Sequence, residues 1–200
     1  YFKDQSTPVK RTKKREELAF DIDEHVRGET TADGLASLRP AFDKEGQVTA
    51  GNSSGINDGA AALILGNAEK VEKSNKSPLA KIVSYGFGGV APRIMGMGPV
   101  PASKMALERA GLKVSQIDIV ESNEAFAAQA CAVSKELSLP SDIVNPNGGA
   151  IALGHPVGAT GAIIMTKLIY ELHRTGGRYG LATMCIGGGQ GIAVIIDTQV

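Results

Sequence analysis

Apolar residues in the second half of the chain switch between two spacings, which predict strands and helices in turn. Short apolar runs bounded by turn residues predict five strands, at residues 79–85, 117–121, 143–145, 180–185 and 192–197. Apolar positions at helical spacing predict three helices, at about residues 101–110, 124–137 and 159–172. The order βαβαβαββ predicts an α/β layered fold with a mixed, mostly parallel sheet that ends in an antiparallel hairpin.

The N-terminal part carries a weaker pattern. Residues 1–47 are polar and mixed in charge, which is typical of an arm or subdomain without a core of its own. Residues 48–59 form a loop-like stretch dense in Asn, Ser and Gly, and the apolar run at residues 60–65 predicts a buried strand. Residues 67–77 predict a short helix followed by a linker.

Composition narrows the function class only a little. The 200 residues are 42% hydrophobic, and 21 basic side chains balance 21 acidic ones, which argues against a general nucleic-acid or membrane-surface binder. No apolar run reaches the length of about 18 residues that a membrane-spanning helix needs. The two cysteines, Cys131 and Cys185, form neither a disulfide framework nor a metal-ligand pattern. They suit a reducing compartment, so we expect a cytoplasmic location, or an organelle if a targeting segment lay upstream. The lack of a ligand pattern predicts no metal site.

One stretch concentrates glycines around a titratable side chain. Residues 147–162 read NGGAIALGHPVGATGA, with five glycines and His155 just before a predicted helix. Glycines allow a ligand to approach the main chain closely, and a helix N-terminus favours anions. The alternative is a glycine-rich turn that carries an incidental surface histidine.

Three reactive side chains follow predicted strands at their carboxyl ends, where ligands collect in α/β sheets. These are Asn123, His155 and Cys185. Asn123 could instead cap the following helix, and Cys185 could be a small buried hydrophobe. Together the three predict acyl chemistry in which cysteine is a nucleophile, as in a Cys-His hydrolase, or a general acid and base. The pattern alone does not choose between these roles.

Three short motifs resemble signatures of the thiolase family, in the family's order. They are NEAFAAQ at residues 123–129, GHP at residues 154–156 and Cys-x-Gly at residues 185–187. The segment AGNSSGINDGAA at residues 50–61 also resembles the family's coenzyme A loop. The similarity covers essentially the whole chain and looks closest to biosynthetic acetyl-CoA acetyltransferases.

The resemblance implies acyl transfer between thioesters, in which two acetyl-CoA give acetoacetyl-CoA and CoA, or a 3-oxoacyl-CoA is cleaved in reverse. His155 would activate the nucleophile and bind a thioester oxygen, and Cys185 would move the α-proton. Asn123 would hold a water in one oxyanion hole, and the Gly187 N–H would serve a second. Coenzyme A is a substrate, and no cofactor is implied. Residues implied to line the coenzyme A and acyl sites are Arg27, Leu38, Phe42, Ala50, Ser54, Gly55, Met95, Ala125 and Phe126.

The family's fourth motif, a Val-Cys-x-Ser-Gly-like segment with the nucleophile, does not occur in the 200 residues. The chain therefore resembles the C-terminal portion: residues 1–56 of a partial loop domain, residues 57–77 of the N-terminal domain and residues 78–200 of the C-terminal domain. We expect this chain alone to be inactive, to expose an apolar patch and to need an N-terminal half. A complete thiolase of this kind is expected to be a homodimer or homotetramer. The alternative is a non-catalytic coenzyme A-binding or assembly fragment.

Overall fold

The computed structural model describes residues 9–13, 16–20 and 22–200, which fall into two units, Tyr1–Ala36 and Ser37–Val200. In the first unit, β1 (Val9–Lys13) and β2 (Glu16–Phe20) pair as an antiparallel hairpin, and α2 (Ala32–Ala36) follows. Residues 22–36 are all exposed, as expected of a segment without its own core. Residues 1–8 of the expected arm lie outside the described residues. The division into residues 1–56, 57–77 and 78–200 stays a prediction.

The second unit is built on a four-stranded sheet in the order β3-β6-β5-β4. Its strands are β3 (Lys81–Gly89), β4 (Ile119–Ser122), β5 (Tyr179–Gly187) and β6 (Gln190–Asp197). The expected mixed sheet and final antiparallel hairpin are confirmed, because β4 and β5 are parallel whereas β6 runs antiparallel to both β3 and β5. Strands β3, β4 and β5 run in the same direction. Only the β4–β5 pair is parallel, however, because β6 lies between β3 and β5.

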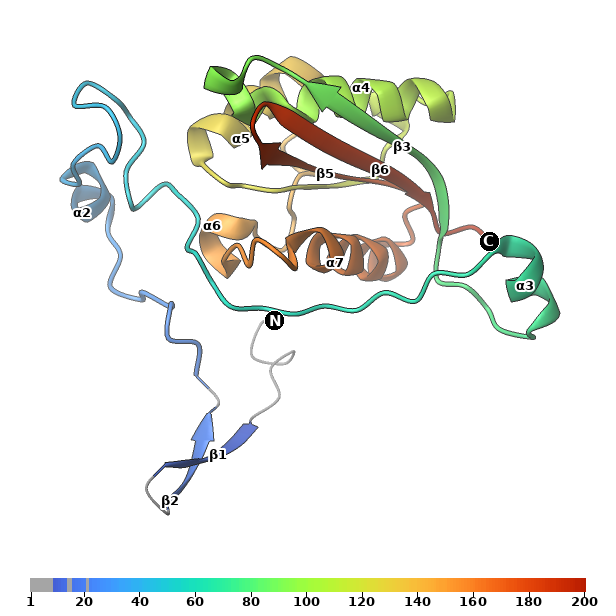
Figure 1. Cartoon of the computed structure of the whole chain (residues 1–200), viewed down its shortest axis with the longest axis horizontal. Coiled ribbons are helices and arrows are strands. Elements are labelled where there is room, and N and C mark those ends of the chain that lie inside the picture. Colours follow the sequence, from blue (N-terminus) through green and yellow to red (C-terminus); the bar gives the residue numbers. More distant parts are fainter. Residues whose placement is uncertain (1–8, 14–15, 21) are drawn as a thin grey trace. The chain divides into compact units, whose positions relative to one another are not determined.

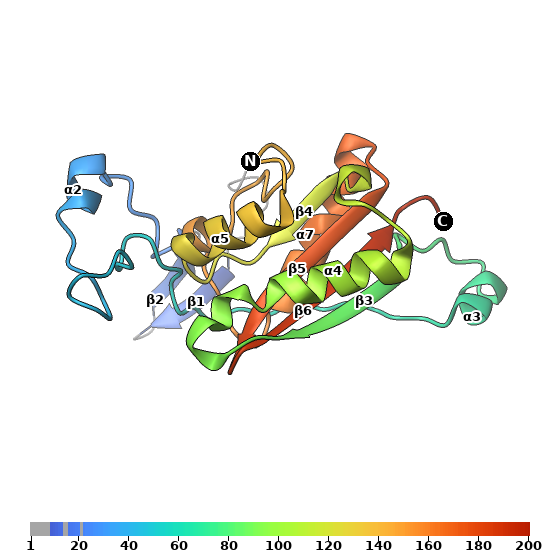
Figure 2. The ribbon, with the colours of Figure 1, turned by 90° about the horizontal axis from the view of Figure 1, so that it is seen from above.

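Helices cover both faces of this sheet (Figure 1). On one face lie α4 (Pro99–Ala110) and α5 (Ala127–Leu137), and on the other α7 (Thr160–Thr175). Seen from above, α4 runs along the sheet (Figure 2). Shorter helical pieces connect these layers: η1 (Pro92–Met97), η2 (Val114–Gln116) and α6 (Ala150–Leu153).

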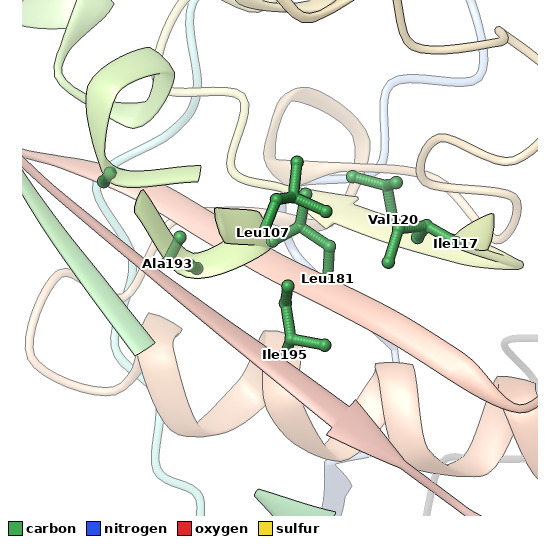
Figure 3. Close-up of a cluster of buried hydrophobic side chains, with 8 residues drawn as sticks. Leu107, Ile117, Val120, Leu181, Ala193 and Ile195 are labelled. Atoms are coloured by element: carbon green, nitrogen blue, oxygen red, sulfur yellow. The ribbon is translucent and has the colours of Figure 1, made fainter. Parts of the chain in front are cut away.

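Each face has its own apolar core. Under α4, Leu107 packs with Leu181 and Ile195 from the sheet (Figure 3). Under α7, Leu168 and Leu172 are fully buried against residues of β4, β5 and β6. The core residues recur every four positions in α7, and in α4 they are Ala102, Ala106 and Leu107, so that one side of each helix faces the sheet, as the helical spacing predicts.

Two predicted strands do not form as strands. The prediction for residues 143–145 is wrong because only Val144 makes a parallel bridge, to Val120, before the chain turns at Asn145 with φ +47°. The prediction for residues 60–65 is also wrong: the segment is irregular and pairs with no described strand, and Ile64 is 102% exposed. An apolar alternation needs a neighbouring strand to become a ladder, and the described residues supply none here.

Two helix boundaries also bear on the predictions. The helix expected from residue 124 begins at Ala127, with Phe126 as an extended N-cap residue. Asn123 is therefore not a helix cap, and its amide is free for another role. The short helix expected in residues 67–77 is confirmed as α3 (Ala68–Lys73), and the Asn67 side chain caps it by accepting a hydrogen bond from the Glu69 N–H.

Candidate active site

Asn123 lies directly beyond the carboxyl end of β4 and is 2% exposed. Its backbone N–H donates to the carbonyl oxygen of Thr183 on β5 at 3.0 Å, which extends the parallel ladder by one residue. Its side-chain Nδ2 lies 3.4 Å from Nε2 of His155. The end of β4 thus places a buried amide beside an imidazole that is distant in sequence.

His155 follows α6 in a loop that is held by the asparagine-rich segment earlier in the chain. Its backbone N–H donates to the carbonyl oxygen of Gly55 at 3.1 Å and to Oδ1 of Asn57 at 3.2 Å. Gly154 before it has φ +96°, and a Cβ there would lie 2.6 Å from the same Asn57 Oδ1. Glycine is therefore required for this approach, and the loop at residues 50–57 frames the histidine.

Thr160 determines which imidazole nitrogen carries the proton. The Thr160 hydroxyl donates to the carbonyl oxygen of Pro156 at 2.9 Å, and its Oγ1 lies 2.7 Å from Nδ1 of His155. A hydroxyl has one proton to donate, so Thr160 accepts from Nδ1–H of His155. The neutral imidazole then presents an unprotonated Nε2 toward the Asn123 amide, where it can accept a proton.

Burial shifts the two titratable groups of the site in opposite directions. It lowers the pKa of His155, which favours the neutral imidazole, and raises the pKa of the Cys185 thiol, which favours the protonated thiol. The side chains are thus a base and a proton donor near neutral pH. A thiol with a raised pKa is a poor nucleophile, which disfavours a Cys-His hydrolase built on Cys185.

Cys185 and Gly187 lie at the same edge of the sheet as Asn123. The parallel register places Ser122 opposite Thr183, so Cys185 follows two residues later on β5. The ladder with β6 is irregular between Cys185 and Gly187, and Gly187 has φ +96°. No hydrogen bond among the described residues joins the Cys185 thiol to Asn123 or His155. The structure therefore brings two of the three predicted side chains into contact and places the third at the neighbouring strand end.

The predicted coenzyme A loop packs on the motif that follows Asn123. Both the backbone N–H and the hydroxyl of Ser54 donate to the carbonyl oxygen of Ala125 at 3.1 Å. The ring of Phe42 packs edge-to-face on Phe126, with centroids 5.9 Å apart. Four of the predicted binding residues thus meet in two contacts beside the site.

Three other predicted binding residues make no hydrogen bond or ring contact with His155 or Asn123 in the described part of the chain. They are Leu38, Ala50 and Met95. Arg27 lies in the unit Tyr1–Ala36 and is exposed. The binding roles of these residues stay predictions.

A partly buried ion pair lies behind the site. Nζ of Lys167 is 2.9 Å from Oε2 of Glu121, which is 1% exposed, and also donates to the Gly148 carbonyl oxygen at 2.7 Å. Burial raises the pKa of Glu121, although Lys167 opposes this shift. The pair lines a cavity of about 30 Å³ together with Asn123 and Thr160. This cavity can hold water but not a thioester.

Among the residues that the structure describes, no helix combines the length and the apolar character that a membrane span requires. Within the described ranges, no group of three or more His, Cys, Asp or Glu side chains is placed to hold a metal ion.

Comparison with known proteins gives matches along the whole chain. Residues 76–198 match the thiolase C-terminal domain, and residues 1–69 match the thiolase N-terminal domain. Beta-ketothiolase BktB of Cupriavidus necator is 58% identical over 98% of this chain and 50% of its own length. An acetyl-CoA acetyltransferase of Shinella zoogloeoides is 54% identical, with the same coverage of both chains. The chain spans half the length of these relatives.

Solved structures agree with the sequence matches. The crystal structure of the Bacillus anthracis acetyl-CoA acetyltransferase has a TM-score of 0.91 and 49% identity, and the match covers 98% of this chain and 50% of that one. Human mitochondrial 3-ketoacyl-CoA thiolase in complex with CoA has a TM-score of 0.83 at 49% identity, over 91% of this chain and 46% of that one. From its domain matches, its relatives and its fold, the chain belongs to the thiolase family.

Proposed function

We propose that the protein containing this chain transfers acyl groups between thioesters. It would condense two acetyl-CoA into acetoacetyl-CoA and CoA, or cleave a 3-oxoacyl-CoA with CoA in reverse. The observation that carries the proposal is the 3.4 Å contact between the Asn123 amide and the unprotonated Nε2 of His155 at the carboxyl edge of the sheet. Relatives named acetyl-CoA acetyltransferase and beta-ketothiolase support the same substrate class.

The proposed roles follow from the protonation states. Neutral His155 accepts the proton of the attacking thiol at Nε2 as the new thioester bond forms, and the CoA thiolate leaves and takes up a proton. The Cys185 thiol donates a proton to the α-carbon during thiolysis. During condensation it gives its proton to the departing CoA thiolate, and the Cys185 thiolate then removes the α-proton of the second acetyl-CoA. The Asn123 amide and the Gly187 N–H would stabilise the thioester oxygens as negative charge develops.

The attacking thiol would come from outside these 200 residues. The chain has two cysteines; Cys131 is exposed on α5, and Cys185 is buried with a raised pKa. We infer that this chain contributes the acid-base and oxyanion groups, and that a thiolase N-terminal half contributes the nucleophile. A homodimeric or homotetrameric assembly and a cytoplasmic location remain predictions, which sedimentation of the natural-length protein and cell fractionation would test.

Steady-state thiolysis of acetoacetyl-CoA tests the proposal. The protein at its natural length is expected to consume acetoacetyl-CoA in a CoA-dependent way, whereas the isolated 200-residue chain is expected to give no turnover above the buffer rate. Absence of turnover at natural length would contradict acyl transfer. Turnover by the isolated chain would contradict the need for an external nucleophile.

A non-catalytic coenzyme A-binding fragment is the second candidate. It is favoured by the packing of Ser54 and Phe42 on the Ala125–Phe126 segment, which needs no nucleophile. Calorimetric titration with CoA separates the two proposals. Binding by the natural-length protein without thiolysis would support the fragment role, and binding together with thiolysis would support the enzyme.

A further inference from the structure

We propose that Asn145 and Glu124 are positioning residues that hold the Asn123 and His155 loops in register. Neither belongs to the predicted catalytic or binding set. Together they connect the end of β4 with the segment that leads to His155. We call this pair of side chains the Asn145 clamp.

The first part of the clamp is a side chain that replaces a strand. The Asn145 side-chain Oδ1 accepts from the Ser122 backbone N–H at 2.9 Å, and its Nδ2 donates to the Ser122 carbonyl oxygen at 2.8 Å. This pair of bonds reproduces what a neighbouring strand residue would make. The side chain is needed because the backbone turns away at Asn145, where φ is +47°.

This arrangement fixes the residue before Asn123 from both sides. Ser122 pairs with Thr183 of β5 on one side and with the Asn145 side chain on the other. The next backbone N–H, that of Asn123, donates to the Thr183 carbonyl oxygen. The direction of the Asn123 amide therefore depends on a clamped peptide.

The second part of the clamp reaches the histidine segment. Oε1 of Glu124 accepts from Nδ2 of Asn145 at 3.2 Å, and Oε2 accepts from the Ile151 N–H at 3.2 Å in the first turn of α6. The carboxylate lies so close to Gly149 that a Cβ there would clash with it. Since α6 leads directly into Gly154 and His155, the same carboxylate ties both loops together.

The chain offers a matched pair of substitutions. Asn145→Gly removes the amide and keeps the positive φ accessible, so it separates the clamp from backbone strain. Asn147→Gly is the control: it removes an identical amide two residues away, which donates to Oε2 of Glu171 on α7 at 2.7 Å. The kinetic test uses the natural-length protein and rests on the proposed acyl transfer.

We expect Asn145→Gly to lower kcat of thiolysis by about 10- to 100-fold, because small misplacements of reacting groups are costly. KM should stay within about two-fold, and Asn147→Gly should leave kcat within about two-fold. In an Asn123→Ala background, Asn145→Gly should lower kcat by less than about three-fold, because the group it positions is already gone. An unchanged kcat, or an equal factor in both backgrounds, would overturn the proposal.

Crystal structures keep the clamp testable if the wild-type protein has no thiolase activity. In Asn145→Gly, the separation between Nδ2 of Asn123 and Nε2 of His155 is expected to exceed hydrogen-bonding distance, and Asn147→Gly should preserve it. Glu124→Gln should widen the same separation, because one of its two acceptor oxygens becomes a donor facing a donor. An unchanged separation in both clamp variants would refute the clamp whether or not acyl transfer occurs.

Discussion

Two apolar regions of the second unit behave in opposite ways. Under α7, Leu168 and Leu172 are fully buried against the sheet. In the segment at residues 56–65, Ile56 is 92% exposed, Ile64 102% and Leu65 75%. Apolar spacing predicts a buried helix in the first region and a buried strand at residues 60–65 of the second, but only the first region packs on strands.

The comparison separates a region that packs on its own sheet from a segment that has no strand to pack on among the described residues. The layered region supplies its own sheet and therefore fixes the strand ends that carry Asn123 and Cys185. The segment at residues 56–65 bridges to His155 through Ile56 and then continues without a pairing partner among the described residues. Contiguous exposed apolar residues mark a surface that another chain or domain covers. This segment is the surface that the N-terminal half proposed above would cover.

The largest effect is expected at the chemical centre. His155→Ala in the natural-length protein should lower kcat of thiolysis by about 10²- to 10⁴-fold, because the general base is removed. His173→Ala is the control, since the one hydrogen bond of its Nε2 within the described ranges is to the Leu79 carbonyl oxygen at 2.8 Å, away from Asn123. If both variants lose activity equally, His155 is not the general base of the reaction.

A stability pair compares the two regions directly. Leu168→Ala should reduce the free energy of unfolding by about 2–5 kcal/mol, because it leaves a cavity in the core. Ile64→Ala in the 200-residue chain should change it by less than about 0.5 kcal/mol, since the side chain is exposed. Denaturant titration of both variants measures this. An equal loss would mean that residues 60–65 are buried in solution.

Exposed apolar residues are also expected to cause self-association of the isolated chain. Replacing Ile64 and Leu65 by Asp should raise the monomer fraction in sedimentation velocity, because charge on an apolar patch opposes burial. Val26→Asp, at an exposed residue of the first unit, should have less effect. If the parent chain sediments as a monomer at all concentrations, the apolar segment needs no cover.

The smallest effect concerns protonation. The pKa of His155 lies below its ordinary value of 6.5 because of burial. As the pH falls from 6.5 toward that lowered pKa, the unfolded chain binds more protons than the folded one, so the free energy of unfolding decreases. Denaturant titrations across this window should show a steeper decrease for the parent than for His155→Gln. A steeper decrease in the variant would mean that folding does not lower the pKa of His155.

Much of the layered region could be predicted from local pattern, and its strand order could not. Apolar spacing identified α4, α5 and α7 and four of the five strands within a few residues. The insertion of β6 between β3 and β5 depends on long-range pairing, which leaves no local trace. Residues 143–145 show the same limit, because a side chain of Asn145 takes the place of the expected ladder.

Some residues of the site could likewise be predicted from the sequence, and others could not. The rule that ligands collect at strand ends selects Asn123, His155 and Cys185, and the structure brings the first two into contact, although the strand expected before His155 does not form. Thr160 and Asn57 were missed, although one fixes the imidazole proton and the other holds the His155 backbone. A threonine that begins a helix, and an asparagine in a loop 98 residues away, carry no signal of such contacts.

A crystal structure of the natural-length protein with a bound acyl-CoA tests the central claim most directly. We predict that the thioester oxygen lies within about 3.2 Å of a water held by the Asn123 amide, and that Nε2 of His155 donates to this oxygen only after it has taken up the thiol proton. The cysteine sulfur that attacks it should come from residues outside this chain. A thioester bound away from His155 and Asn123 would contradict the account.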